Sequence, residues 1–256
     1  MDKSCFCNSK TDSFIETMRA LFAGRFATQD IEWYYRIIPL LFFGLNVYLN
    51  AWKVVKVGPN SPNASLLPIV QKAGYRFCYE CNFNAPPRSF HCPDHHCSFV
   101  GCCVGHFNQR YFVAAIFNLL PITITCVIWN IFMLIPIFNN LFNIWKVIFP
   151  HLALLIGAIS FYQFILIATF AFSVTTLTFN IYLIIAQLFC LLFGQTRVEY
   201  LQNINIYNLG IWKNLNETLG EKWPFIFISP FIKSPLRSDG HSFITREMQE
   251  ARPKYF

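Results

Sequence analysis

The feature that most constrains this chain is a stretch of 86 residues, from Tyr111 to Thr196, in which Lys146 is the only formal charge. Such a stretch must lie mostly in lipid, where backbone polar groups need partners within the protein. Of the 256 residues, 55% are hydrophobic and 13% charged, about half the charge of a soluble domain. The sequence predicts an all-α polytopic membrane protein and excludes a soluble core, disorder, collagen and coiled coil.

Hydropathy and chain-breaking residues divide the sequence into five segments. They are an N-terminal segment (1–36), a transmembrane helix (37–57), a Cys-rich domain (58–112), a transmembrane region (113–193) and a C-terminal tail (194–256). The first helix is flanked by a Trp-Tyr-Tyr cluster, which is typical of a membrane interface, and it ends at Gly58-Pro59. We find no convincing signal peptide in the N-terminal segment.

The second transmembrane region has room for two or three spans. We expect helices over Val113–Phe138 and Ser173–Phe193, and a third helix or a re-entrant segment over Pro150–Thr169. Basic residues concentrate in the Cys-rich domain and the tail, and the net charge of +7 follows the positive-inside rule without calling for nucleic acid. Both segments are therefore expected in the cytosol, with an even number of crossings between them.

Six of the ten cysteines lie between residues 78 and 103, which indicates metal binding or chemistry and not disulfide stapling. Cys78 and Cys81 form a C-x-x-C pair, and two thiolates at this spacing can turn back onto one tetrahedral zinc ion. Further candidate ligands follow in the sequence: His91, Cys92, His96 and Cys103. The segment therefore predicts zinc binding.

The run Asp94-His95-His96-Cys97 combines a nucleophile with a base. A free cysteine thiol has a pKa of about 8.5, so a neighbouring imidazole is needed to raise the thiolate fraction near neutral pH. In an extended chain His95 and Cys97 point to one side and His96 to the other. Asp94 orients His95 if Pro93 introduces a turn. By residue types alone, the alternative is that Cys97 is one more zinc ligand.

Taken together, these motifs resemble the DHHC-type protein S-acyltransferases, the family that moves palmitate from palmitoyl-CoA to cysteines of other proteins. The resemblance is carried by Cys78-x-x-Cys81, Pro87-x-Ser89-x-His91-Cys92, Asp94-His95-His96-Cys97, Cys103-Val104-Gly105 and Asn108-x-Arg110-Tyr111-Phe112. It continues in Thr196-Arg197-Val198-Glu199 and Asn205-Ile-Tyr207-Asn208-Leu-Gly210. It covers most of the chain from about residue 37, and the lack of Pro-Trp after Cys97 is similar to the subgroup of the human member numbered twenty-four.

The resemblance implies a two-step reaction. Cys97 attacks the acyl-CoA thioester with His95 as base and Asp94 as orienting residue, and a target cysteine then takes the acyl group from the enzyme. Cys97 lies sixteen residues before the span expected at Val113, so it can meet an acyl chain held in the bilayer. Two basic residues are candidates for binding the CoA phosphates: Arg88 and Arg110.

By the same resemblance, the zinc ligands divide into two Cys₃His sites. Cys78, Cys81 and His91 match the first, and Cys92, His96 and Cys103 match the second. The family has a further C-x-x-C before the tetrad, but here Pro93 alone fills that interval, so six of the eight expected ligands remain. Either Cys102 substitutes at one site, or a single zinc ion is bound, for example through Cys78, Cys81, Cys92 and one His.

A second departure from the family is that one span, not two, precedes the Cys-rich domain. The missing parts are typical of an alternative transcript or an incomplete gene model. They leave two hypotheses: an active palmitoyltransferase, or a catalytically inactive relative that acts as a membrane scaffold or competitor. The family further implies Golgi or endoplasmic reticulum membranes, a Cys-rich domain facing the cytosol, and partner proteins with accessible cysteines.

Overall fold

The computed structural model describes residues 30–58, 76–78, 83–85, 97, 100–135, 143–240 and 243–251. Side chains are described in these ranges from residue 37 onward, except at 76–78, 83–85 and 197–198. The chain divides into two units, Met1–Phe42 and Phe43–Phe256. The described residues are predominantly helical, and the second unit holds the elements that position the functional site.

Three long helices carry the apolar sequence: α2 (Asp30–Val57), α3 (Gln109–Leu134) and α6 (Phe161–Phe193). Their apolar parts comprise 21, 26 and 33 residues. A helix of about 20 apolar residues is enough to cross the hydrocarbon core of a bilayer. By length and composition, all three qualify as membrane spans, which confirms the predicted all-α polytopic membrane fold.

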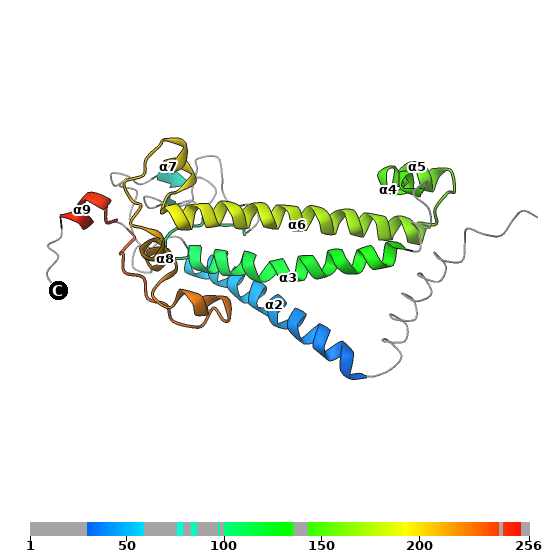
Figure 1. Cartoon of the computed structure of the whole chain (residues 1–256), viewed down its shortest axis with the longest axis horizontal. Helices are drawn as coiled ribbons and strands as arrows, with labels where there is room; N and C mark the ends of the chain where they lie inside the picture. Colours follow the sequence, from blue (N-terminus) through cyan, green and yellow to red (C-terminus); the bar gives the residue numbers. More distant parts are fainter. Residues whose placement is uncertain are drawn as a thin grey trace, which may run out of the picture. The chain divides into compact units, whose positions relative to one another are not determined.

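Helices α3 and α6 lie side by side and run antiparallel (Figure 1). Polar side chains link them at both ends. The amide of Gln109 donates to Gln187 at 3.2 Å, while Asn130 donates to Ser173 at 3.0 Å and accepts from Thr169 at 3.1 Å. Within a bilayer such interhelical bonds are worth about 0.6 kcal/mol each on average. They fix the register of two otherwise apolar surfaces.

The region between α3 and α6 differs from the sequence expectation. Two short helices, α4 (Trp145–Ile148) and α5 (Pro150–Leu155), precede α6. Helix α6 then begins at Phe161, after the N-cap residue Ser160, whose side chain forms a capping box with Gln163. No Gly or Pro interrupts the helix before residue 193. The expected segment Pro150–Thr169 is therefore divided between α5 and the first turns of α6, and two long helices lie in the 113–193 region. The five segment boundaries remain predictions.

The described part of the Cys-rich segment contains a small hairpin. Strands β1 (Arg76–Cys78) and β2 (Phe83–Ala85) pair antiparallel, with Cys78 opposite Phe83. Cys78 is the last residue of β1, and Cys81 falls among the four residues between the strands, which lie outside the described residues. Elsewhere the described residues form no further paired strands of this kind.

The segment after α6 folds back onto the helices. It contains α7 (Arg197–Leu201), α8 (Ile211–Leu219), the 3₁₀ helix η4 (Trp223–Phe227) and α9 (Arg246–Glu250). Its apolar side chains share one buried cluster with α3 and α6: Val113, Ala114, Leu191, Leu215, Leu219 and Ile226. Burial of apolar surface at about 25 cal/mol per Å² stabilises this attachment.

The end of α6 is fixed to the tail by Asn214, a buried residue of α8. Its amide donates to the Leu192 carbonyl at 2.8 Å, and its carbonyl oxygen accepts from the Leu209 amide at 3.0 Å. Helix α6 ends at Gly194, whose φ of 59° lies in the left-handed region. A Cβ at this position would lie 2.7 Å from the Asn214 oxygen, so only glycine fits.

Candidate functional site

Cys97 lies at the start of a tight turn and is half-buried. Its carbonyl oxygen accepts hydrogen bonds from the amides of Val100 at 3.1 Å and Gly101 at 2.8 Å. Cys97 also forms an antiparallel bridge with Cys102. The turn needs the left-handed φ of 70° at Gly101, which glycine adopts without steric cost. These bonds hold Cys97 to the segment from Val100 to Cys102 that follows it.

The turn packs against an apolar cluster drawn from three helices. Val54 of α2, Phe112 and Ile116 of α3 and Ile184 of α6 are buried together, and Cys97 contacts this cluster. The candidate nucleophile therefore lies where the ends of three apolar helices meet. That Cys97 meets an acyl chain held in the bilayer remains a prediction.

An apolar groove of about 360 Å³ opens beside this turn. Helix α2 lines it with Val47, Ala51 and Val54, and helix α3 lines it with Phe112 and Leu119. Val100, three residues after Cys97, completes the lining at the end nearest the turn. The groove is mostly apolar, which suits a hydrocarbon chain.

Asn108 holds the turn region to α2 and is completely buried. Its side-chain oxygen accepts from the Gly105 amide at 2.7 Å. Its amide group donates to the carbonyls of Val54 at 3.0 Å and Cys103 at 2.9 Å. The sequence indicated Asn108 only as part of a motif. A polar residue just before a long apolar run was the available signal for this positioning role.

The donor atoms in the Cys-rich segment suit zinc. Cys103 is completely buried, Cys78 is the last residue of strand β1, and a C-x-x-C pair such as Cys78 and Cys81 is a spacing that zinc knuckles use. The other predicted ligands, Cys81, His91, Cys92 and His96, lie outside the described residues. Among the side chains that are described, no three of the types His, Cys, Asp or Glu form a metal-binding group.

The predicted catalytic partners Asp94 and His95, and the predicted CoA ligand Arg88, also lie outside the described residues. Arg110 is described and part-buried. Its guanidinium donates to the carbonyl of Ser234 and lies 4.7 Å from the centroid of the Tyr111 ring. Arg110 therefore ties the start of α3 to the C-terminal segment. Its predicted contact with CoA phosphates remains a prediction.

The Thr196–Glu199 motif forms a capping box. The Glu199 carboxylate accepts from the Thr196 amide at 2.8 Å, and the Thr196 hydroxyl accepts from the Glu199 amide at 3.2 Å. Both residues are buried. The sequence indicated these residues only as part of the resemblance, and their hydrogen bonds show that they start α7.

Comparison with known proteins gives a family for this arrangement. Residues 71–204, just over half of the chain, match the model of the DHHC palmitoyltransferase family. The chain is 34% identical to the probable palmitoyltransferase ZDHHC24 of Mus musculus over 188 residues, covering 67% of this chain and 65% of that protein. It is 32% identical to ZDHHC24 of Danio rerio over 77% of this chain and 71% of that protein. With human palmitoyltransferase ZDHHC15 the identity is 27%, over 74% and 57% of the two chains.

The match with the mouse protein spans somewhat less than two thirds of that relative's length. The alignment has 188 positions but covers 67% of the 256 residues of this chain, which is about 172 residues. About sixteen positions of the mouse protein are therefore aligned to gaps in this chain. The family match nevertheless includes the Asp94–Cys97 tetrad and the first helix after it. This chain belongs to the DHHC palmitoyltransferase family.

Proposed function

We propose that this chain is a protein S-acyltransferase, which moves palmitate from palmitoyl-CoA to cysteines of target proteins through an acyl-enzyme on Cys97. The observation that carries the proposal is the position of Cys97 in a fixed turn, against the ends of three apolar helices and beside an apolar groove. Membership of the family supports the same activity.

In the first step, the thiol of Cys97 gives its proton to His95, and the sulfur attacks the thioester carbonyl of palmitoyl-CoA. A C–S bond to Cys97 forms, the bond to the CoA sulfur breaks, and the CoA thiolate takes the proton back from His95. Asp94 orients His95 and stabilises its charged form, as in other nucleophile–base–orienter sites. The result is a thioester on Cys97.

In the second step, a cysteine of the target protein attacks the thioester on Cys97. His95 accepts the proton of that cysteine and returns it to Cys97 as the acyl group leaves. The reaction exchanges one thioester for another, so no oxidant or reductant is required. Partner proteins need an accessible cysteine close to the membrane surface.

The acyl chain is accommodated in the groove between α2 and α3. Burial of each CH₂ contributes about 0.8 kcal/mol, so the fifteen carbons beyond the carbonyl contribute about 12 kcal/mol. Val100 and Phe112 place the groove next to the turn that bears Cys97. Arg88 and Arg110 are the candidates for the CoA phosphates, which remain in the aqueous phase.

Zinc would be held by Cys78, Cys81, His91, Cys92, His96 and Cys103. When bound, it supplies folding energy to the segment and takes no part in the acyl transfer. The loss of a second C-x-x-C leaves either two three-ligand sites, which Cys102 completes in part, or one four-ligand site. Both arrangements keep Cys97 outside the ligand set.

A second function is favoured by one specific observation, the shortened Cys-rich segment. The relatives have positions that this chain lacks, and six of the eight expected ligands remain. A segment with less bound zinc has less folding energy available to hold His95 against Cys97. In that case the chain is a catalytically inactive relative that acts as a membrane scaffold or competitor.

The proposed location is an endomembrane, Golgi or endoplasmic reticulum, with the Cys-rich domain facing the cytosol. The basic residues of the Cys-rich segment and of the tail support this orientation. Two helices long and apolar enough to span a membrane lie between these segments among the described residues, and this even number supports the same orientation.

The proposal is tested by the release of CoA from palmitoyl-CoA by the purified full chain in lipid nanodiscs. We expect release by the wild type, none by Cys97→Ala, and normal release by Cys126→Ala, which removes a part-buried thiol of α3. If the folded wild type releases no more CoA than Cys97→Ala, the chain is the inactive relative. Equal loss in both cysteine variants would instead show a general folding effect and contradict a specific role of Cys97.

A further inference from the structure

The residues from Trp223 to Phe231 have one packed face and one open face. Ile226 is buried in the cluster with α3, α6 and α8, and Phe227 packs against it. Phe225, Ile228 and Phe231 are 53%, 53% and 59% exposed. Phe225 belongs to η4, while Ile228 and Phe231 follow in the turn after it, and the exposure of all three defines the open face of this segment. An open face of three large apolar side chains requires an apolar partner.

Contacts with α3 fix the height of this segment along the helix. The side chain of Asn118 donates to the Phe227 carbonyl at 3.1 Å, and the rings of Phe117 and Phe227 meet edge to face at 5.3 Å. Asn118 lies nine residues after the first residue of α3, which corresponds to about 13 Å along the axis at 1.5 Å per residue.

The depth of α3 in a bilayer follows from its length. Its 26 residues span about 39 Å, about 9 Å more than a hydrocarbon core of about 30 Å. With the excess shared between both ends, Asn118 lies about 9 Å inside the core, and the segment bonded to it reaches a similar depth. Interfacial segments typically bury their apolar face about 5–10 Å into the boundary between headgroups and acyl chains.

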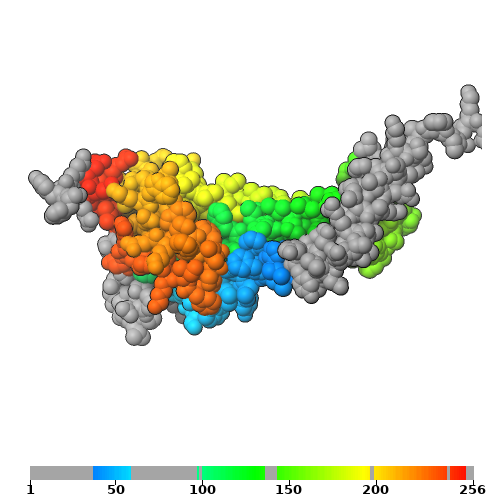
Figure 2. Space-filling model, turned by 60° about the horizontal axis from the view of Figure 1, so that its bottom comes forward, coloured from blue at the N-terminus to red at the C-terminus, as the bar shows by residue number. Residues whose placement is uncertain are grey.

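Lysines surround the open face where headgroups are expected. Lys222 and Lys233 flank the segment and are exposed. Lys53 of α2 has its Nζ 5.3 Å from the centroid of the Phe231 ring, and the C-terminal segment, orange in Figure 2, lies against α2 in blue. Lysine side chains with apolar stems and a charged end suit this boundary, because the ammonium group can extend to the lipid phosphates.

We propose that Trp223–Phe231 is an interfacial lipid anchor, whose open face of Phe225, Ile228 and Phe231 inserts among the acyl chains of the bilayer leaflet at the Cys97 end of the helices. The partner is the lipid bilayer itself. This inference does not depend on the proposed acyl transfer.

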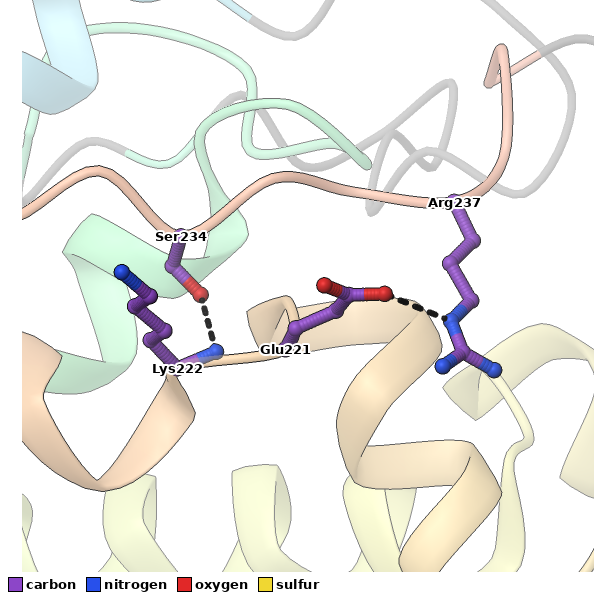
Figure 3. A network of polar contacts seen from close by, with 4 residues as sticks. All are labelled: Glu221, Lys222, Ser234 and Arg237. Atoms are coloured by element: carbon purple, nitrogen blue, oxygen red, sulfur yellow. Dashed lines mark hydrogen bonds and ion pairs between the residues drawn. The ribbon is translucent and has the colours of Figure 1, made fainter.

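Hydrogen bonds connect the anchor to the start of α3. The Ser234 hydroxyl accepts from the Lys222 amide and donates to the Leu219 carbonyl, both at 3.0 Å, and Arg110 donates to the Ser234 carbonyl. Figure 3 shows Ser234 beside Lys222, with the exposed ion pair Glu221–Arg237 at 3.2 Å next to it. Insertion of the anchor would therefore fix the height of Arg110 relative to the membrane surface.

The test is photo-crosslinking of the full chain in phosphatidylcholine liposomes. Benzoylphenylalanine replaces one exposed residue at a time, at Phe225, Ile228 or Phe231, and lipid adducts are measured by mass spectrometry. Ile128, an exposed residue of α3, is the positive control. Met248 is the matched negative control, because it is 60% exposed on a short helix that carries four charged or polar neighbours.

We expect lipid adducts at the three anchor positions in amounts comparable with those at Ile128. We expect no lipid adducts at Met248. Substitution at exposed positions leaves the packed face intact, and size-exclusion chromatography in detergent verifies folding. Absence of lipid adducts at all three positions in folded protein would overturn the proposal. A crosslink between two protein copies at these positions would overturn it as well, because the face would then be a protein interface.

Discussion

Replacing Asn108 by leucine is expected to release the turn region that bears Cys97. Leucine has the same number of side-chain heavy atoms as asparagine and branches at the same carbon, so the change removes hydrogen bonds without opening a cavity. Three bonds are lost, to the Gly105 amide and to the carbonyls of Val54 and Cys103. At about 1 kcal/mol net per bond, the loss is about 3 kcal/mol.

A loss of this size is large enough to measure locally. Because 1.4 kcal/mol corresponds to a factor of ten, about 3 kcal/mol raises the population of locally open states about 100-fold. Amide hydrogen exchange in a peptide covering residues 100–112 should accelerate by that factor, since the Gly105 amide loses its acceptor. A peptide covering residues 143–155 is expected to keep its exchange rate.

The matched control is Asn205→Leu, because the Asn205 side chain is exposed. This variant is expected to exchange like the wild type throughout. The reasoning is refuted if Asn108→Leu changes exchange in residues 100–112 by less than about threefold, which corresponds to only about 0.65 kcal/mol. Such a result would mean that other contacts hold the turn.

Three further outcomes follow from the contacts at the helix ends. Gly194→Ala should lower the thermal unfolding midpoint, measured by fluorescence-detected size exclusion, because its Cβ would lie 2.7 Å from Asn214 in a left-handed conformation. A double-mutant cycle of Gln109→Leu and Gln187→Leu should give a coupling of about 0.6 kcal/mol, and additive effects would contradict the bond between them. Burial raises the pKa of the Glu217 carboxyl above its usual value. Ionising this carboxyl is therefore less favourable in the folded than in the unfolded protein, and the resulting loss of stability appears as the pH rises through the usual pKa. Glu217→Gln should therefore stabilise the protein at neutral pH, and this gain in stability should disappear at a pH below the usual pKa of glutamate. An equal gain at neutral and at acidic pH would argue against burial as the cause.

The helices were largely predictable because their apolar composition is a local property. The expected start of α3 at Val113 was late by four residues, since the helix begins at Gln109. Hydropathy does not register Gln109 and Arg110, which are polar but helical. The early start of α6 was missed for a related reason. Hydropathy registers composition, whereas the start of the helix at Phe161 depends on the capping bonds between Ser160 and Gln163.

Of the candidate site, the approximate location of Cys97 could be predicted from contiguous sequence, whereas its catalytic role and those of Asp94 and His95 remain predictions. The tetrad and its distance from Val113 placed Cys97 near the ends of the spans, and the structure has it against α2, α3 and α6. The contacts of Arg110 were not predictable, because its partner Ser234 is 124 residues away. Pairings of this kind depend on how the C-terminal segment folds back, which local sequence patterns do not determine.

The central claim, that Cys97 carries the acyl group, is tested most directly by labelling cells with an alkyne analogue of palmitate. The wild type is compared with Cys97→Ser, and the label is treated with hydroxylamine, which cleaves thioesters. The account predicts a hydroxylamine-sensitive label on the wild type that is absent from Cys97→Ser. A wild-type protein that reaches the membrane without any Cys97-dependent label would contradict the account.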